Sequence, residues 1–177
     1  MSDDLLYDVI IIGGGPAGLS AAQYCARSNL KTIVIDKSAT AGALAFTSII
    51  ENYPGLPSPV SGKELLDIFR KQAIAFGSEY AEDQVVGVKL DGEIKEVRTL
   101  EKTFRGKALI IATGSMGRKP TIKGERDFLG RGVSYCAICD AAFYRGKTVC
   151  VIGDSEEAVK EAGLLTRFAE KVYLISP

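Results

Sequence analysis

The stretch that decides the fold is Val9-Ile10-Ile11-Ile12-Gly13-Gly14-Gly15-Pro16-Ala17-Gly18. A short apolar run that is rich in Ile and ends at glycine predicts a buried strand over residues 7–12. Residues 16–27 then predict a helix, and the apolar run 32–36 predicts a second strand. A strand, a helix and a strand within about thirty residues predict a right-handed βαβ crossover with parallel strands.

The glycines of this stretch match the spacing G-x-G-x-x-G, and Asp36 closes the next predicted strand. Gly13 permits a tight turn, Gly15 lets a pyrophosphate approach the backbone, and Gly18 lets helix and strand pack closely. Free N–H groups at the helix start attract phosphate, and Asp36 can accept hydrogen bonds from a ribose. We therefore expect a dinucleotide site rather than a glycine turn that binds nothing, although the spacing does not distinguish FAD from NAD.

Further signals extend this unit. Ser61-Gly62-Lys63-Glu64 forms a capping box, which predicts the start of a helix. Asp91-Gly92 lies between two alternating segments and predicts a β-hairpin. The expected core stripe of the helix is Leu65, Phe69, Ala73 and Phe76, and the expected strands are 84–90, 93–99 and 104–113.

The last part of the chain repeats the βαβ pattern over residues 148–152, 155–168 and 172–175. Residues 114–131 are expected to form a linker, and its Arg118 and Lys119 are too few basic residues for a binding patch. Two strands and one helix leave sheet edges uncovered, so we expect a truncated domain or one that another chain completes.

Composition excludes several classes of function. The 177 residues carry 22 basic and 22 acidic side chains, and a zero net charge argues against nucleic acid as a partner. The chain has no histidine, which excludes Ser-His-Asp catalysis and histidine-ligated metals. The acidic start Met1-Ser2-Asp3-Asp4 is no signal peptide, and no apolar run has the length of a membrane span. We expect a cytoplasmic protein that does not bind membranes.

Cys136 and Cys139 form a C-x-x-C pair, which suits a redox disulfide or half of a zinc site. A four-cysteine zinc site needs a second pair, but Cys25 and Cys150 are isolated and are expected in the core. A thiolate of the pair could attack a disulfide of a partner, and the second cysteine would resolve the mixed disulfide. Asp140 offers a carboxylate that could carry the proton.

Four segments, 9–22, 51–55, 110–114 and 132–140, together strongly resemble the low-molecular-weight thioredoxin reductases. The resemblance implies that the first fingerprint binds the ADP half of FAD and that Asn52 and the turn 112–114 lie along the flavin. Ala41-Gly42-Ala43-Leu44 stands where the family usually has Gly-Gly-Gln-Leu, so the glutamine side chain that could make one polar flavin contact is missing, while flavin binding is still expected. The implied cofactor-binding residues are Gly13, Gly15, Pro16, Ala17, Gly18, Asp36, Lys37, Gly42, Leu44, Asn52, Val86, Ala112, Thr113 and Gly114.

The same resemblance implies a fold and a reaction. The fold is α/β, with a three-layer Rossmann-like FAD-binding domain over residues 1–114 that lacks its C-terminal segment. Residues 115–177 begin a second, incomplete Rossmann-like domain of the nicotinamide type. Electrons would pass between FAD, the Cys136/Cys139 pair and a thioredoxin-like protein, with Cys139 facing the flavin, Cys136 attacking the partner and Asp140 as acid–base. Relatives are homodimers whose two domains rotate against each other.

The second nucleotide fingerprint departs from the family pattern. Gly153 and Ala158 fit G-x-G-x-x-A, but Ser155 replaces the middle glycine, and Asp154, Glu156 and Glu157 add charges that repel phosphate. The basic residues that usually follow the next strand are missing up to Pro177. Two readings stay open: an ordinary NADPH site that tolerates Ser155, or a weakened or lost site. In the second case, the alternatives are another electron donor, such as the ferredoxin of some relatives, or a redox sensor without turnover.

Overall fold

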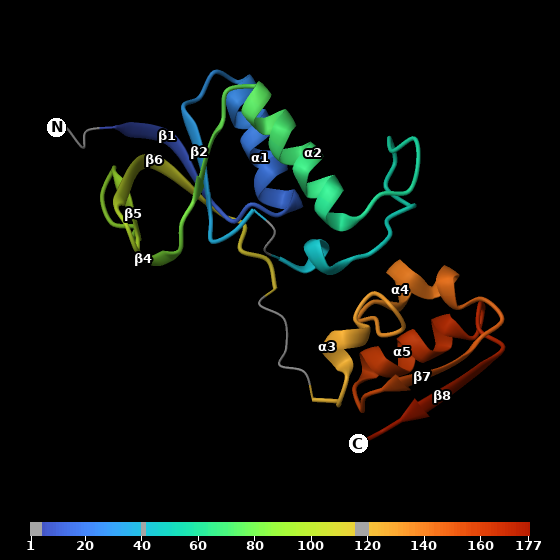
Figure 1. Cartoon of the computed structure of the whole chain (residues 1–177). Helices are drawn as coiled ribbons and strands as arrows, with labels where there is room; N and C mark the ends of the chain where they lie inside the picture. Colours follow the sequence, from blue (N-terminus) through green and yellow to red (C-terminus); the bar gives the residue numbers. More distant parts are fainter. Residues whose placement is uncertain (1–4, 40–41, 116–120) are drawn as a thin grey trace. The chain divides into compact units, whose positions relative to one another are not determined.

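The computed structural model describes residues 5–39, 42–115 and 121–177, and the chain divides into two compact units, residues 1–120 and 121–177 (Figure 1). The domain boundary expected between residues 114 and 115 stays a prediction. The first unit contains β1 (Leu6–Ile12), α1 (Pro16–Arg27), β2 (Thr32–Asp36), η1 (Ala43–Phe46), α2 (Gly62–Ala75), β3 (Glu79–Glu82), β4 (Val85–Lys89), β5 (Lys95–Thr99) and β6 (Thr103–Ile111).

The first unit is built on a six-stranded sheet with the order β3-β2-β1-β6-β5-β4. The strands β3, β2, β1 and β6 are parallel, and Ile11 pairs with Val34 on one side and with Ile110 on the other. The strands β6, β5 and β4 continue as an antiparallel meander. The predicted βαβ crossover is therefore confirmed. Parallel order also brings the C-terminal ends of β1, β2 and β6 to one edge, where α/β folds bind ligands.

Three layers form because the central strands are apolar on both faces. Helices α1 and α2 lie on one face of the sheet (Figure 1), where Val9 and Ile11 pack with Leu19 and Leu66. On the other face, Ile10 and Ile35 belong to a cluster with Val97 and Phe104 of the meander. The α/β fold expected from the sequence is confirmed, and β1, which leads into the glycine turn, has a core cluster on each face.

Local chemistry accounts for the helix starts. Pro16 stands at the first turn of α1, where its missing N–H costs nothing. Ser61 and Glu64 form the expected capping box of α2: the Ser61 hydroxyl accepts from the amide of Glu64, and the Glu64 carboxylate accepts from the amide of Ser61. This contact also lowers the pKa of Glu64.

Some expectations for the first unit were wrong. Phe76 is 43% exposed, because α2 ends at Ala75 and the ring lies beside the guanidinium of Arg27 instead of in the core. The predicted hairpin is confirmed, because β4 pairs antiparallel with β5, and Gly92 has the positive φ that hairpin turns favour. Its loop is longer than a two-residue turn. The strand expected over 104–113 is β6, which ends at Ile111.

The second unit contains α3 (Glu125–Phe128), α4 (Ala137–Asp140), η2 (Ala141–Tyr144), β7 (Thr148–Ile152), α5 (Glu156–Leu165) and β8 (Lys171–Ile175). The strands β7 and β8 are parallel, which confirms the second βαβ unit. Ala137, Ala141 and Leu165 form its small core. The segment that carries the two cysteines thus packs on α5.

The predicted linker is wrong over residues 121–131. This segment contains α3, whose Glu125 is buried and accepts hydrogen bonds from the amides of Thr121 and Ile122. A buried carboxylate that holds two amides fixes a turn, and a flexible connector has no such contact. Arg118 and Lys119 lie outside the described residues.

Cys25 and Cys150 differ from each other. Cys25 is half-buried against the core of the first unit, and burial raises the pKa of its thiol. Cys150 is exposed on β7, so the expectation that it lies in the core was wrong. The reason is the alternation of β7: Val149 and Val151 pack with Leu165 of α5, while Cys150 lies on the opposite face of the strand and is exposed.

Candidate dinucleotide and dithiol sites

The turn after β1 requires glycine at two positions. Gly13 has φ 111°, and a Cβ there would overlap the carbonyl oxygen of Ala112. A Cβ on Gly18 would overlap the carbonyl oxygen of Gly13. Any side chain at either position would therefore push α1 or the turn after β6 out of place. The close packing expected for Gly18 is present, and the tight turn at Gly13 also lies directly against the residues that follow β6.

Gly15 is glycine for a different reason. Its backbone is extended, with φ −77° and ψ −178°, which any residue adopts, and a Cβ there would meet nothing within 4 Å. The space above Gly15 is open, and Gly15, as the N-cap residue, offers no side chain to the first amides of α1. Pro16 and Ala17 form the first turn beside it. An open, uncapped start of a twelve-residue helix fits a pyrophosphate group, so the residues present can hold a dinucleotide there.

Asp36 at the end of β2 is tied to the glycine turn. Its Oδ2 accepts a hydrogen bond from the amide of Gly14, and its Oδ1 accepts one from the amide of Ser38 at 3.3 Å. These contacts fix the carboxylate beside the open space, and each oxygen keeps a second lone pair for a ribose hydroxyl. The sequence analysis assigned Gly14 no role, yet its amide positions the predicted ribose acceptor.

Tyr80 on β3 is a second residue that sequence reasoning missed. A Cβ on Gly14 would overlap the Tyr80 hydroxyl, so this ring and the glycine turn are in contact. Burial, together with the negative charge of Asp36, raises the pKa of Tyr80 to about 12, so the phenol stays protonated at neutral pH. Arg70 of α2 lies over the ring at 5.7 Å and donates to the carbonyl of Ala39 at 3.1 Å. These contacts brace the loop after β2.

The remaining predicted flavin-binding residues lie on four segments. Ala112 borders Gly13, and its amide donates to the carbonyl of Ile12 at 2.8 Å, which places the turn 112–114 beside the glycine turn. The loop of Asn52 is closed at its base by paired hydrogen bonds between Ile50 and Val60. The other predicted residues lie as follows: Gly42 is the N-cap of η1, Leu44 is half-buried in η1, Lys37 is exposed after β2, and Val86 is exposed on β4. Ala41 lies outside the described residues.

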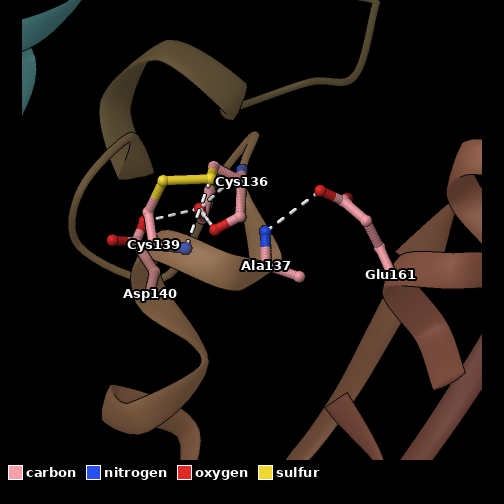
Figure 2. Close-up of a disulfide and its surroundings, with 6 residues drawn as sticks. Cys136, Ala137, Cys139, Asp140 and Glu161 are labelled. Carbon is pink, nitrogen blue, oxygen red and sulfur yellow. Dashed lines mark hydrogen bonds between the residues drawn. A yellow bond between two sulfur atoms is a disulfide. The ribbon is translucent and has the colours of Figure 1, made fainter. Parts of the chain in front are cut away.

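Cys136 and Cys139 form a disulfide with Cα atoms 5.3 Å apart (Figure 2). Cys136 stands at the N-cap of the short helix α4, and its Sγ accepts a hydrogen bond from the amide of Cys139 at 3.2 Å. Cys136 is half-buried and Cys139 is exposed, and Ile138 between them is 80% exposed. The two sulfur atoms are bonded to each other, and the redox role of the pair stays a prediction. Within the described ranges, no group of three or more His, Cys, Asp or Glu residues could hold a metal ion.

Two side chains outside the C-x-x-C motif organise this turn. The Ser134 hydroxyl donates to the carboxylate of Asp140 at 2.5 Å and accepts from the amide of Cys136 at 3.1 Å. The carboxylate of Glu161, on α5, accepts from the amide of Ala137 at 3.1 Å (Figure 2). The sequence analysis found Asp140 but missed Ser134 and Glu161. Ser134 lies only two residues before the motif, so its proximity in the sequence could have identified it, whereas no neighbouring residue points to Glu161.

The second fingerprint keeps the close packing between Gly153 and Ala158, but Ser155 places a side chain at the position that corresponds to Gly15. A Cβ on Gly153 would lie 2.9 Å from the Cβ of Ala158, so both residues must be small. Ser155 has the same extended backbone as Gly15, with φ −85° and ψ 160°, but its Oγ accepts the amide of Ala158 at 3.2 Å. One amide of the first turn of α5 is therefore already used. Glu156 and Glu157 add negative charge in the same turn. These residues do not fit a second pyrophosphate as Gly15 fits the first.

Comparison with known proteins assigns the chain to a family. Residues 7–177 match the family model described as pyridine nucleotide-disulphide oxidoreductase, and the chain belongs to that family. Within that family, the chain is similar to proteins named thioredoxin reductase. It is 51% identical to a thioredoxin reductase of Aquifex aeolicus, over 98% of this chain and 54% of the relative. It is 46% identical to that of Bacillus subtilis, over 99% of this chain and 55% of the relative.

A solved structure agrees with these relatives. The crystal structure of thioredoxin reductase from Streptococcus pyogenes superposes with a TM-score of 0.90 at 42% identity, over 96% of this chain and 55% of that one. The chain spans about half the length of the curated relatives it matches. The resemblance drawn from the glycine and cysteine motifs is thereby confirmed at the level of family and fold.

Proposed function

We propose that the chain belongs to a flavin-dependent thiol–disulfide oxidoreductase that exchanges electrons between FAD, the Cys136–Cys139 disulfide and a thioredoxin-like protein. The observation that carries the proposal is the Cys136–Cys139 disulfide on a chain that also has an open helix start at Gly15, where a dinucleotide fits. The relatives named as thioredoxin reductases support it. When bound, FAD supplies a two-electron carrier.

The residues of the first unit would bind and orient the cofactor. The open start of α1 at Gly15 receives the pyrophosphate, and Asp36, fixed by the amide of Gly14, accepts from the ribose. Lys37, Gly42, Leu44, Asn52, Val86 and the turn 112–114 would complete the site. A carboxylate at Asp36 suits a free ribose and repels a 2′-phosphate, which favours FAD over NADP in this cradle.

The residues of the second unit would carry the thiol chemistry. Reduction of the disulfide takes two electrons and two protons and leaves two thiols. Cys136 would then attack a disulfide of the partner, Cys139 would resolve the mixed disulfide, and Asp140 would take and return the proton at its carboxylate. The Ser134 hydroxyl holds that carboxylate beside the amide of Cys136.

The partner we propose is a thioredoxin-like protein. Ile138 is 80% exposed and Tyr135 is 49% exposed beside the disulfide, and exposed apolar side chains of this kind suit a protein substrate. One relative, from Mycobacterium leprae, is named a bifunctional thioredoxin reductase/thioredoxin. We further propose a cytoplasmic homodimer. Among the described residues, no helix combines the length and apolar character needed to cross a membrane.

A second candidate concerns the electron donor. Because Ser155 occupies an amide that a phosphate would need, we propose that NADPH binds weakly and that another reductant supplies the electrons. The charges of Glu156 and Glu157 act in the same direction. The reading in which Ser155 is tolerated predicts ordinary NADPH reduction.

Anaerobic titration distinguishes these candidates. The flavin-loaded protein receives NADPH, NADH or a low-potential viologen, together with an oxidised thioredoxin. We expect the viologen to bleach the flavin band and to support reduction of the thioredoxin. NADPH at the same concentration should bleach it at least about tenfold more slowly, since Glu156 and Glu157 each oppose its phosphates by about 1 kcal/mol or more. Prompt bleaching by NADPH would exclude the second candidate. Bleaching by the viologen without thioredoxin reduction would exclude the oxidoreductase itself.

A further inference from the structure

The amides that follow the dithiol are not equally available. The amide of Cys139 faces the sulfur of Cys136 at 3.2 Å, where it would stabilise a thiolate. The amide of Ala137, the first after Cys136, instead donates to the Glu161 carboxylate at 3.1 Å (Figure 2). The amide of Ala137 is therefore not available to a Cys136 thiolate, and the negatively charged carboxylate of Glu161 lies at that amide.

Glu161 reaches this turn from another element. It lies on α5, 24 residues after Ala137, and is half-buried. Ala137 and Ala141 pack with Leu165 of the same helix, so the cysteine turn and α5 form one core that holds the carboxylate in place. A charge fixed by packing acts more strongly on its neighbours than a mobile surface charge does.

We propose that Glu161 is a positioning residue of the dithiol, which keeps the reduced Cys136 mainly as the thiol. Its carboxylate occupies the amide of Ala137, so that this amide cannot donate to a Cys136 thiolate, and it places a negative charge at that amide. Reduction of the disulfide by two electrons and two protons gives the two thiols. Cys136 loses its proton to a base only when it attacks the disulfide of a partner. The inference rests on the proposed function, because it concerns the pair that exchanges the electrons.

A second carboxylate, that of Asp140, is tied to this turn through Ser134 and acts in the same direction. This carboxylate, held by Ser134, also disfavours a thiolate. Burial, together with the charge of Asp140, raises the pKa of Tyr144 on η2. Asp140 is the proposed proton carrier and exchanges its proton during the reaction. Glu161 has no such part, so its charge sets the resting state of the turn.

Replacement of Glu161 by glutamine separates the charge from the hydrogen bond, because the amide oxygen of Gln still accepts from Ala137. The full chain is reduced with dithiothreitol, freed of it under nitrogen, and treated with iodoacetamide at pH 7. Alkylation of Cys136 is followed by tandem mass spectrometry. We expect Glu161→Gln to raise its alkylation rate about threefold to tenfold, because that rate follows the thiolate fraction.

Two variants make the result decisive. Glu161→Asp keeps the charge on a shorter side chain, so it should raise the rate by less than half as much as Glu161→Gln. Glu170→Gln removes the same charge from an exposed position of the second unit and should leave the rate unchanged. An unchanged rate in Glu161→Gln, or an equal rise in either of the other variants, would overturn the inference.

The assay is independent of the proposed function. It uses no flavin, no electron donor and no protein partner, so a protein that failed to reduce thioredoxin would still show the Glu161 effect. A role of Glu161 in packing alone predicts that Glu161→Gln, which keeps the hydrogen bond, leaves the rate as it is. A rise in that variant therefore requires the charge.

Discussion

FAD affinity should fall at least about 100-fold in Gly15→Val, a loss of roughly 2.7 kcal/mol of binding free energy. The expected cause is steric exclusion at the ligand, because a Cβ on Gly15 meets no protein atom and the backbone there is already extended. The side chain would occupy the space through which the pyrophosphate approaches the start of α1. Quenching of flavin fluorescence by the protein measures the dissociation constant.

Stability should separate this variant from its neighbours. Gly15→Val should unfold at nearly the same temperature as the original chain without cofactor. Gly18→Val should be strongly destabilised, because its Cβ would overlap the carbonyl of Gly13. Gly163→Val on α5 also meets no protein atom, and it should keep the FAD affinity. Normal FAD binding by a well-folded Gly15→Val would contradict the placement of the cofactor.

The second large effect is expected at the dithiol. Cys136→Ser and Cys139→Ser should each lower the reduction of a thioredoxin-like protein at least about 10³-fold, because serine oxygen forms no disulfide and groups that act as a unit fail together. Flavin binding should persist in both variants, since the cysteines lie in the second unit and the glycine turn in the first. Turnover with an oxidised thioredoxin and a viologen donor measures the loss.

The other cysteines provide the control. Cys150 is exposed and unpaired with any other cysteine, so Cys150→Ser should keep full activity and full stability. The single variants at Cys136 and Cys139 should also differ from each other. By the proposed roles, Cys139→Ser traps a stable mixed disulfide with the partner, and Cys136→Ser forms none. A trapped complex through Cys139 instead would reverse the two assignments, and undiminished turnover in either variant would contradict the mechanism.

The parts of the fold that were predictable depend on local chemistry. The turn from Gly13 to Gly18, the capping box at Ser61 and the second βαβ unit are all set by residues adjacent in sequence. The strand β3 was missed because Glu-Tyr-Ala-Glu is a polar edge strand without an apolar run. Its existence depends on pairing with β2, which no local pattern encodes.

The candidate site shows the same division. The sequence identified Asp36 and the cysteine pair because their spacing follows from one motif each. Tyr80 and Glu161 were missed because each reaches its site from an element far along the chain, through the pairing of β3 with β2 and the packing of α5. The prediction that Cys150 is buried was wrong for a related reason. A residue on a strand is buried only where another layer covers that face of the sheet, and the residues of the strand do not show whether such a layer is present.

The most direct test counts electrons between flavin and sulfur. The oxidised protein with FAD is given reducing equivalents under nitrogen, in steps of fewer than two electrons per chain, and the thiols of Cys136 and Cys139 are trapped and counted beside the flavin absorbance. If the flavin and the disulfide exchange electrons, both thiols should appear together, and their number should change in step with the flavin absorbance before four electrons per chain have been added. A fully bleached flavin beside an intact disulfide, at equilibrium and at every ratio of electrons, would contradict the account.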